Sequence, residues 1–238
     1  MNSESPAGKA SGCAQRSPTP PEILVCFALK EESAPFEKTA ISRPDVRLLI
    51  TGIGRKNAER RTRDFLETHG PALVLSCGFA GGLNPAIGLS TVLAETADPA
   101  LLQRLTAAGA RRAIFCCGGR VATTASEKAE LWRTIGADAV EMESEAIQAV
   151  CRERGVACAT VRVISDIAGE DLPLDFNRVS KPDLSLDYGK LALSIALAPW
   201  KIPALLKLRR QTTAAAKELA RVLGRFLDVK VGNEKPSP

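Results

Sequence analysis

The sequence has a single histidine, His69, and none of its seven cysteines forms a Cys-x-x-Cys pair. Zinc sites and Cys-His catalytic pairs need combinations of these residues, so the sequence argues against both. We expect the cysteines to be reduced thiols that fill the core. Aromatic residues make up only 4% of the chain. They form no cluster of the kind on which nucleic-acid bases stack, so no nucleic-acid partner is expected.

Long apolar runs are missing too. No stretch approaches the roughly 20 apolar residues of a membrane span, and the Ser- and Pro-rich residues 1–21 lack the apolar run of a signal peptide. We expect a disordered leader over 1–21, one domain with a basic C-terminal helix over 22–228, and a flexible tail over 229–238. The expected location is the cytoplasm, with a peripheral contact to the membrane left open.

Short β-rich runs alternate with helical patterns along the chain. This alternation predicts an α/β fold, a single-domain three-layer α/β/α sandwich with a mixed, mainly parallel central sheet. The expected strands are 23–28, 46–51, 72–76, 91–94, 113–117, 137–141 and 156–164. The expected helices are 57–69, capped by Asn57, then 99–108, a helix capped by Ser126 that ends at 135, one that starts near 143, and 204–227.

Three carboxylates follow predicted strands: Glu32, Glu143 and Asp166. Ligands of an open α/β sheet bind outside the carboxyl ends of its strands, so these acids are candidates for one site. Together they could protonate a leaving group, activate a water and hold the hydroxyls of a sugar, as the cleavage of a glycosidic bond requires. A purely structural role at a helix N-terminus remains an alternative for Glu143 and Asp166.

Two glycine motifs also follow predicted strands. Gly52-Ile-Gly54 lacks the third glycine of a dinucleotide site. It predicts either a simple tight turn or a turn whose backbone N–H groups face a ribose, a water or a phosphate. The glycines of Gly78-Phe-Ala-Gly-Gly-Leu83, expected as a loop, would let the backbone approach a flat ligand.

Five segments in order resemble the nucleoside phosphorylase superfamily: Ala28-Leu-Lys-Glu-Glu, Thr51-Gly-Ile-Gly, Ser76-Cys-Gly-Phe-Ala-Gly-Gly-Leu, Val140-Glu-Met-Glu-Ser and Val161-Arg-Val-Ile-Ser-Asp. Within it the chain looks most similar to the methylthioadenosine/S-adenosylhomocysteine nucleosidase branch. The resemblance runs from about Ile23 to Asp166 and beyond. It implies a small-molecule adenine nucleoside as partner, no metal or organic cofactor, and a homo-oligomer, commonly a dimer.

The resemblance also implies roles for single residues. Glu32 matches the acid/base that activates the attacking water, and Asp166 matches the acid that protonates N7 of the departing purine. Glu143 matches the acceptor of the ribose 2′ and 3′ hydroxyls. The substrate-binding residues that the motifs imply are Gly54, Phe79, Ala80, Gly81, Met142, Glu143 and Ser165.

The segment between Leu83 and Glu141 is shorter than in that branch, and no aromatic base-stacking residue is carried over onto it. The short middle and the basic C-terminal segment are similar to the hopanoid-associated phosphorylase branch, which implies an adenosylhopane type of substrate. The apolar and cationic residues around Trp200 are typical of an interfacial segment. The alternative is a C-terminal helix that covers the sheet and exposes a basic face to solvent.

We therefore predict a nucleosidase that hydrolyses the N-glycosidic bond of a 5′-substituted adenine nucleoside of the methylthioadenosine, S-adenosylhomocysteine or adenosylhopane type. The first alternative is a phosphate-dependent purine nucleoside phosphorylase, with Gly54, Arg55 and Lys56 near the phosphate. The second is a non-catalytic nucleoside- or lipid-binding protein.

Overall fold

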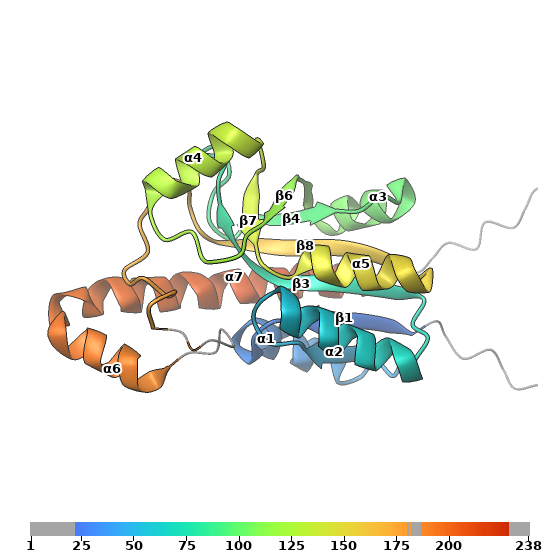
Figure 1. Ribbon diagram of the computed structural model, residues 1–238. Helices are drawn as coiled ribbons and strands as arrows, with labels where there is room; N and C mark the ends of the chain where they lie inside the picture. Colours follow the sequence, from blue (N-terminus) through green and yellow to red (C-terminus); the bar gives the residue numbers. More distant parts are fainter. Residues whose placement is uncertain (1–21, 180, 182–186, 229–238) are drawn as a thin grey trace, which may run out of the picture.

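The computed structural model describes residues 22–179, 181 and 187–228 (Figure 1). The predicted leader and tail lie outside these residues, and so does Cys13. The described chain forms an eight-stranded sheet with helices on both faces, which confirms the predicted α/β sandwich. The strands are β1 (Ile23–Phe27), β2 (Val46–Ile50), β3 (Leu73–Gly82), β4 (Val92–Glu95), β5 (Arg111–Arg112), β6 (Phe115–Cys117), β7 (Ala139–Glu141) and β8 (Ala157–Asp166).

The sheet is mixed but mainly parallel. Its main path has the order β2-β1-β3-β8-β4-β5, and β7 joins β3 to β6 beside that path. Only the pairs β3–β7 and β4–β8 are antiparallel. Because β1, β3 and β8 are parallel neighbours, their carboxyl ends open at the same edge of the sheet. That edge is where a ligand is expected in a sheet of this type.

Helices cover the two faces of the sheet unequally. Apolar side chains of α1, α3 and α7 pack on one face, and those of α2 and α5 pack on the other. The helices are α1 (Lys30–Ala40), α2 (Arg55–Thr68), α3 (Pro99–Ala108), α4 (Ala125–Ile135), α5 (Ser144–Arg154), α6 (Tyr188–Leu197) and α7 (Ile202–Asp228), with a 3-10 turn at Pro199–Lys201. In Figure 1, α6 and the first turns of α7 extend beyond the sheet on the left.

The helix boundaries follow local capping chemistry. Helix α3 has the predicted bounds, with Asp98 as its N-cap and Gly109 in a left-handed C-cap. Two predicted caps were wrong. Helix α4 is capped by Thr124 instead of Ser126. Helix α2 begins directly after Gly54, which has a positive φ of 87° and is the N-cap residue in place of Asn57.

Helix α1 was not predicted, and it changes the setting of Glu32. The helix starts three residues after β1, and Glu32 lies in its first turn, not at a strand end. The Glu32 carboxylate accepts the backbone N–H groups of Ala28 and Leu29 at 3.0 and 2.9 Å. A carboxylate is favoured at this end of a helix, because the free N–H groups and the dipole there are positive. The sequence of α1 gives only a weak helix signal, because it is mostly polar and contains Pro35.

The motif Gly78-Phe-Ala-Gly-Gly-Leu83 was expected to form a loop, but its residues up to Gly82 belong to strand β3. β3 continues to Gly82, because β8 pairs with it as far as Asp166 and β7 pairs with Gly81 and Gly82 from the other side. Glycine weakens a strand signal in a sequence, since it has no side chain to pack. At Gly78 the missing side chain leaves space for Arg162 and Glu32, and not for a ligand.

A Gly78→Ala substitution tests this use of space. Gly78 has a φ of +147°, and a Cβ atom there would lie 2.7 Å from Arg162 Nη1 and 2.8 Å from Glu32 Oε1. We expect the variant to lose about 2–4 kcal/mol of unfolding free energy, from backbone strain and overpacking together. Urea unfolding measures this loss. Gly88→Ala is the matched control, because no atom lies within 4 Å of its added Cβ, and an equal loss in the two variants would contradict the argument.

Candidate active site

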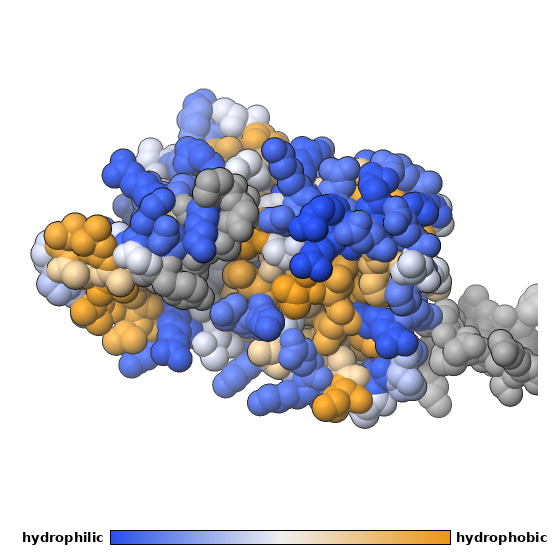
Figure 2. Space-filling model, turned by 60° about the horizontal axis from the view of Figure 1, so that its bottom comes forward, coloured by the Kyte–Doolittle hydropathy of each residue, from blue (hydrophilic) through white to orange (hydrophobic). Residues whose placement is uncertain are grey.

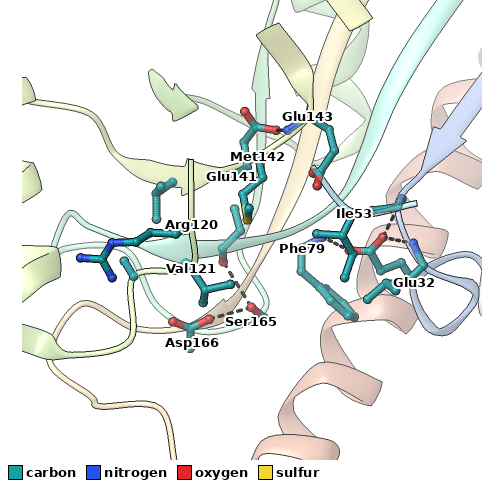
Figure 3. Close-up of a pocket in the computed structure, with 16 residues that line it drawn as sticks. Glu32, Ile53, Phe79, Arg120, Val121, Glu141, Met142, Glu143, Ser165 and Asp166 are labelled. Carbon is teal, nitrogen blue, oxygen red and sulfur yellow. Dashed lines mark hydrogen bonds between the residues drawn. The ribbon is translucent and has the colours of Figure 1, made fainter. Parts of the chain in front are cut away.

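A cavity opens at the carboxyl ends of β1, β3 and β8 (Figure 3). It contains all of the site residues predicted from the sequence except Gly54, namely Glu32, Phe79, Ala80, Gly81, Met142, Glu143, Ser165 and Asp166. Gly54 lies behind this lining, where its N–H donates to Glu143 Oε1 at 2.8 Å. The structure thus brings together residues that lie up to 134 positions apart, between Glu32 and Asp166.

Glu32 lies at one end of the cavity and is 4% exposed. Its Oε1 accepts the N–H of Phe79 at 2.9 Å, and its Oε2 accepts two N–H groups of its own turn. Burial raises the pKa of Glu32 to about 7, although Arg162 and these N–H groups act in the opposite direction. A carboxyl with a pKa near neutrality can accept and return a proton at physiological pH.

Arg162, from the middle of β8, holds the carboxylates of this end together. Its side chain is 1% exposed, and Nη2 lies 2.7 Å from Glu141 Oε2 and 3.3 Å from Glu143 Oε2. It also donates to Ser76 Oγ at 3.2 Å. Arg162 Nε is buried without a hydrogen-bond partner, so the ion pairs carry the stabilisation of this cation. A buried cation is costly unless it is paired, so the acids and Arg162 depend on each other.

Glu141 and Glu143 have different environments, although only one residue separates them. Burial acts to raise the pKa of Glu141, but Arg162 and three donors from Glu143 and Ser144 outweigh it and hold that pKa below its usual value. Burial raises the pKa of Glu143, against the opposing charge of Arg162. Both residues line the cavity, but Glu141 is bound to Arg162 and the start of α5, whereas Glu143 accepts fewer hydrogen bonds.

Asp166 lies across the cavity from Glu32 (Figure 3). Its Oδ1 accepts the hydroxyl of Ser165 at 2.8 Å, and its Oδ2 accepts Lys128 Nζ at 2.5 Å. Gly81 stands opposite Asp166 in the β3–β8 register, and a Cβ atom at Gly81 would come within 3.3 Å of Oδ2. The absence of a side chain at Gly81 leaves room for the Asp166 carboxyl group.

The segment before α4 forms a wall of the cavity through Arg120, Val121 and Ala122. The side chain of Asn177 fixes this segment, because it bonds both the N–H and the carbonyl of Val121 at 3.0 Å. Phe79 is the only aromatic side chain among the residues that line the cavity. The segment before α4 thus supplies Arg120 together with aliphatic and backbone atoms to the wall.

Sequence reasoning missed Arg162 and Lys128, although both lie inside segments that it singled out. Arg162 had a readable signal, since a charged residue in the centre of an apolar strand must be paired in the fold. Lys128 had none, because its partners Asp166, Ile167 and Glu170 come from a distant part of the chain. Within the described ranges, no group of three or more His, Cys, Asp or Glu side chains is arranged to hold a metal ion.

Comparison with known proteins agrees with the fold and with the sequence motifs. The sequence model of the family described as "Phosphorylase superfamily" matches residues 92–184, a range that includes Met142, Glu143, Ser165 and Asp166. The match covers less than half of the chain and shows a similarity to this superfamily over these residues.

Similar proteins come from both the curated sequences and the solved structures. A curated 5′-methylthioadenosine/S-adenosylhomocysteine nucleosidase of Anoxybacillus flavithermus is 29% identical over an alignment that covers 60% of this chain and 77% of that protein. Futalosine hydrolase of Helicobacter pylori superposes with a TM-score of 0.66 at 17% identity, covering 87% of this chain and 97% of the other. The Campylobacter jejuni nucleosidase gives 0.65 at 18%, covering 87% and 98%. At these identities the two structures establish the fold only.

The raised pKa of Glu32 predicts how stability depends on pH. A carboxyl group with a pKa of about 7 in the folded state and 4.5 unfolded stabilises the fold fully below pH 4.5, and this contribution is lost as the pH rises through about 7. The loss amounts to at most about 3.5 kcal/mol, since the two pKa values lie about 2.5 apart and one pKa unit corresponds to about 1.4 kcal/mol. Urea unfolding of the wild type and Glu32→Gln between about pH 4.5 and about pH 8 should give a flatter curve for the variant. Parallel curves would show that Glu32 titrates normally.

Proposed function

We propose that the protein is a nucleosidase that hydrolyses the N-glycosidic bond of a 5′-substituted adenine nucleoside and releases adenine. The observation that carries this proposal is the grouping of Glu32, Glu143 and Asp166 around one cavity. Cleavage of a glycosidic bond requires an acid for the leaving group, a base for the water and negative charge beside the sugar. The curated relative's name, a nucleosidase of methylthioadenosine and S-adenosylhomocysteine, supports the same chemistry.

At the sugar end, Glu32 is the proposed base. With a pKa of about 7, it is substantially ionised at neutral pH and can accept a proton from a water that attacks C1′. As the bond to the base breaks, C1′ and the ring oxygen become positively charged. Glu143 accepts the ribose hydroxyls and places negative charge next to them, and Met142 packs on the sugar. Arg162 is already paired with Glu141 and Glu143, so it keeps these acids in place without a free charge facing the sugar.

At the purine end, Asp166 is the proposed acid. Adenine leaves more readily once N7 carries a proton, and Asp166 supplies that proton. Ser165 orients the carboxyl group through Oδ1. Phe79, Ala80 and Gly81 form the floor between the two ends, where the flat nucleoside would lie against the backbone of β3. Gly54 acts on the substrate indirectly, by holding Glu143.

Water is favoured over phosphate as the nucleophile. Of the residues that line the cavity, Arg120 alone has an exposed cationic side chain, and it is paired with Glu127. Arg55, which follows Gly54, is paired with Glu145 at 2.8 Å. A phosphate ion at the sugar end would meet the carboxylates of Glu32 and Glu143, and the Gly54 N–H at the start of α2 already donates to Glu143. Phosphate sites usually offer Arg, Lys or the N–H groups of a helix N-terminus directly to the anion.

Adenine release tests the proposal. We expect the purified protein to release adenine from methylthioadenosine or S-adenosylhomocysteine without phosphate, and added phosphate to leave the rate unchanged. Asp166→Asn should lower kcat by about 100-fold or more, because it removes the proton donor. Asp64→Asn, at an exposed position on α2, is the control. Release that requires phosphate would indicate a phosphorylase, and nucleoside binding without release would indicate a binding protein.

An adenosylhopane type of substrate is the finer part of the proposal, and an exposed apolar surface supports it. This surface, called here the hairpin surface, lies on α6, the 3-10 turn and the start of α7. It consists of Leu193, Leu197, Trp200, Ile202 and Leu206, whose exposed fractions run from 41% to 73%. Figure 2 shows apolar side chains gathered at this end of the molecule.

Cations surround the hairpin surface: Lys190, Arg209 and Arg210 are exposed near it, and Lys201 is partly exposed. Apolar side chains with Trp and cations at their border match the interface of an anionic membrane. Each Lys or Arg near such a surface contributes about 1 kcal/mol to the binding free energy. No helix in the described part of the chain is long and apolar enough to cross a bilayer. The proposed partner is therefore the membrane surface, where a lipid-linked nucleoside would be presented.

Vesicle binding tests this partner. We expect the protein to cosediment with vesicles of phosphatidylcholine mixed with phosphatidylglycerol, and much less with phosphatidylcholine alone. The double variant Leu197→Glu/Trp200→Glu should lose this binding and still release adenine from methylthioadenosine. Ile41→Glu, at another exposed apolar residue, is the control. Unchanged binding in the double variant would contradict the proposal. A homodimer that this variant dissociates, seen by light scattering, would assign the hairpin surface to a second copy of the chain.

A further inference from the structure

Lys128 is an unusual residue in this molecule. It lies in the second turn of α4 and is 0% exposed, and it is the only fully buried lysine in the part of the chain that the structure describes. Burial of an ammonium group costs several kcal/mol unless its charge and its donors are matched. A lysine in this position therefore has a defined set of partners, or the fold would not tolerate it.

The partners of Lys128 all come from the end of β8 and the loop that follows it. Nζ donates to Asp166 Oδ2 at 2.5 Å and to the carbonyls of Ile167 and Glu170, both at 3.0 Å. These three bonds use all three donors of an ammonium group. The one side-chain partner is the carboxyl group of Asp166, the proposed acid, and Lys128 itself does not line the cavity.

We propose that Lys128 is a positioning residue for leaving-group protonation, acting through Asp166; this inference rests on the proposed function. Lys128 occupies Oδ2, so Asp166 takes up a proton from water on Oδ1, the oxygen beside Ser165, before it transfers that proton to the base. In the transfer, the O–H bond at Oδ1 breaks and an N–H bond forms at purine N7. The electron pair of the C1′–N9 bond leaves with the base. The carboxylate left behind is stabilised by the ammonium group 2.5 Å away.

The same contacts suggest a competing, purely structural role. The bonds to the carbonyls of Ile167 and Glu170 tie α4 to the loop after β8, and α4 follows the wall segment at Arg120–Ala122. If Lys128 only held this wall, its loss would impair every substrate alike. If it serves protonation, its loss matters only for leaving groups that need a proton.

The experiment therefore compares two leaving groups in one set of variants. Adenine release requires protonation of the base, whereas 4-nitrophenyl riboside expels a stable nitrophenolate that needs no proton. We expect Lys128→Met to lower kcat for adenine release by about 100-fold or more. We expect kcat for the nitrophenyl riboside to fall by less than about threefold. Lys207→Met is the matched control, because Lys207 pairs with Glu170 in the same loop but is exposed.

Each outcome bears on one claim. Equal losses on the two substrates, or no loss on adenine release, would overturn the inference about Lys128. Failure of the wild type to cleave either substrate would overturn the proposed function instead. If Lys128→Met does not fold, as judged by circular dichroism, Lys128→Gln keeps a donor for the loop carbonyls without the charge. It should show the same selective loss, and a loss shared by both substrates in this variant would again contradict the inference.

Discussion

The site depends on one buried cation, Arg162. It lies in the middle of β8, under the cavity, and it is within 3.3 Å of both Glu141 and Glu143. Without it, the burial of three glutamates in so small a volume would be prohibitive, because no positive charge would offset the ionised carboxylates. The glycine at position 78 makes this arrangement possible, since a side chain there would occupy the space that Arg162 and Glu32 fill.

At each end of the cavity, a buried cation is paired with carboxylates, but the number of acids and their environments differ. At the proposed sugar end, one arginine is paired with two acids, and burial raises the pKa of Glu32 to about 7 while the pKa of Glu141 is held below its usual value. At the proposed purine end, Lys128 is paired with one acid, Asp166, and its remaining donors bind backbone carbonyls. Neighbouring acids with different environments can take different chemical roles, which is what acid–base catalysis in one pocket requires.

Much of this arrangement could be predicted from the sequence, because strand ends and glycine turns have local signals. Examples are the parallel strands, the bounds of α3 and the grouping of Glu32, Glu143 and Asp166 at one edge of the sheet. The extension of β3 to Gly82 could not be predicted, since its pairing partners β7 and β8 are distant in sequence. Helix α1 was not predicted because its sequence is polar, and α6 was not predicted because the spacing of apolar residues becomes irregular after Pro173. Lys128 looks like any surface lysine until its partners are known.

The central claim is that Glu32, shifted to a pKa of about 7 by burial, is the base of a hydrolytic reaction. The most direct test is the pH dependence of kcat/KM for adenine release. Below about pH 7 the carboxyl is protonated and cannot accept a proton, so kcat/KM should fall by about tenfold for each pH unit. In Glu32→Gln this limb should disappear and the remaining rate should be low. A profile that stays flat down to pH 5, or an unchanged limb in the variant, would contradict the account.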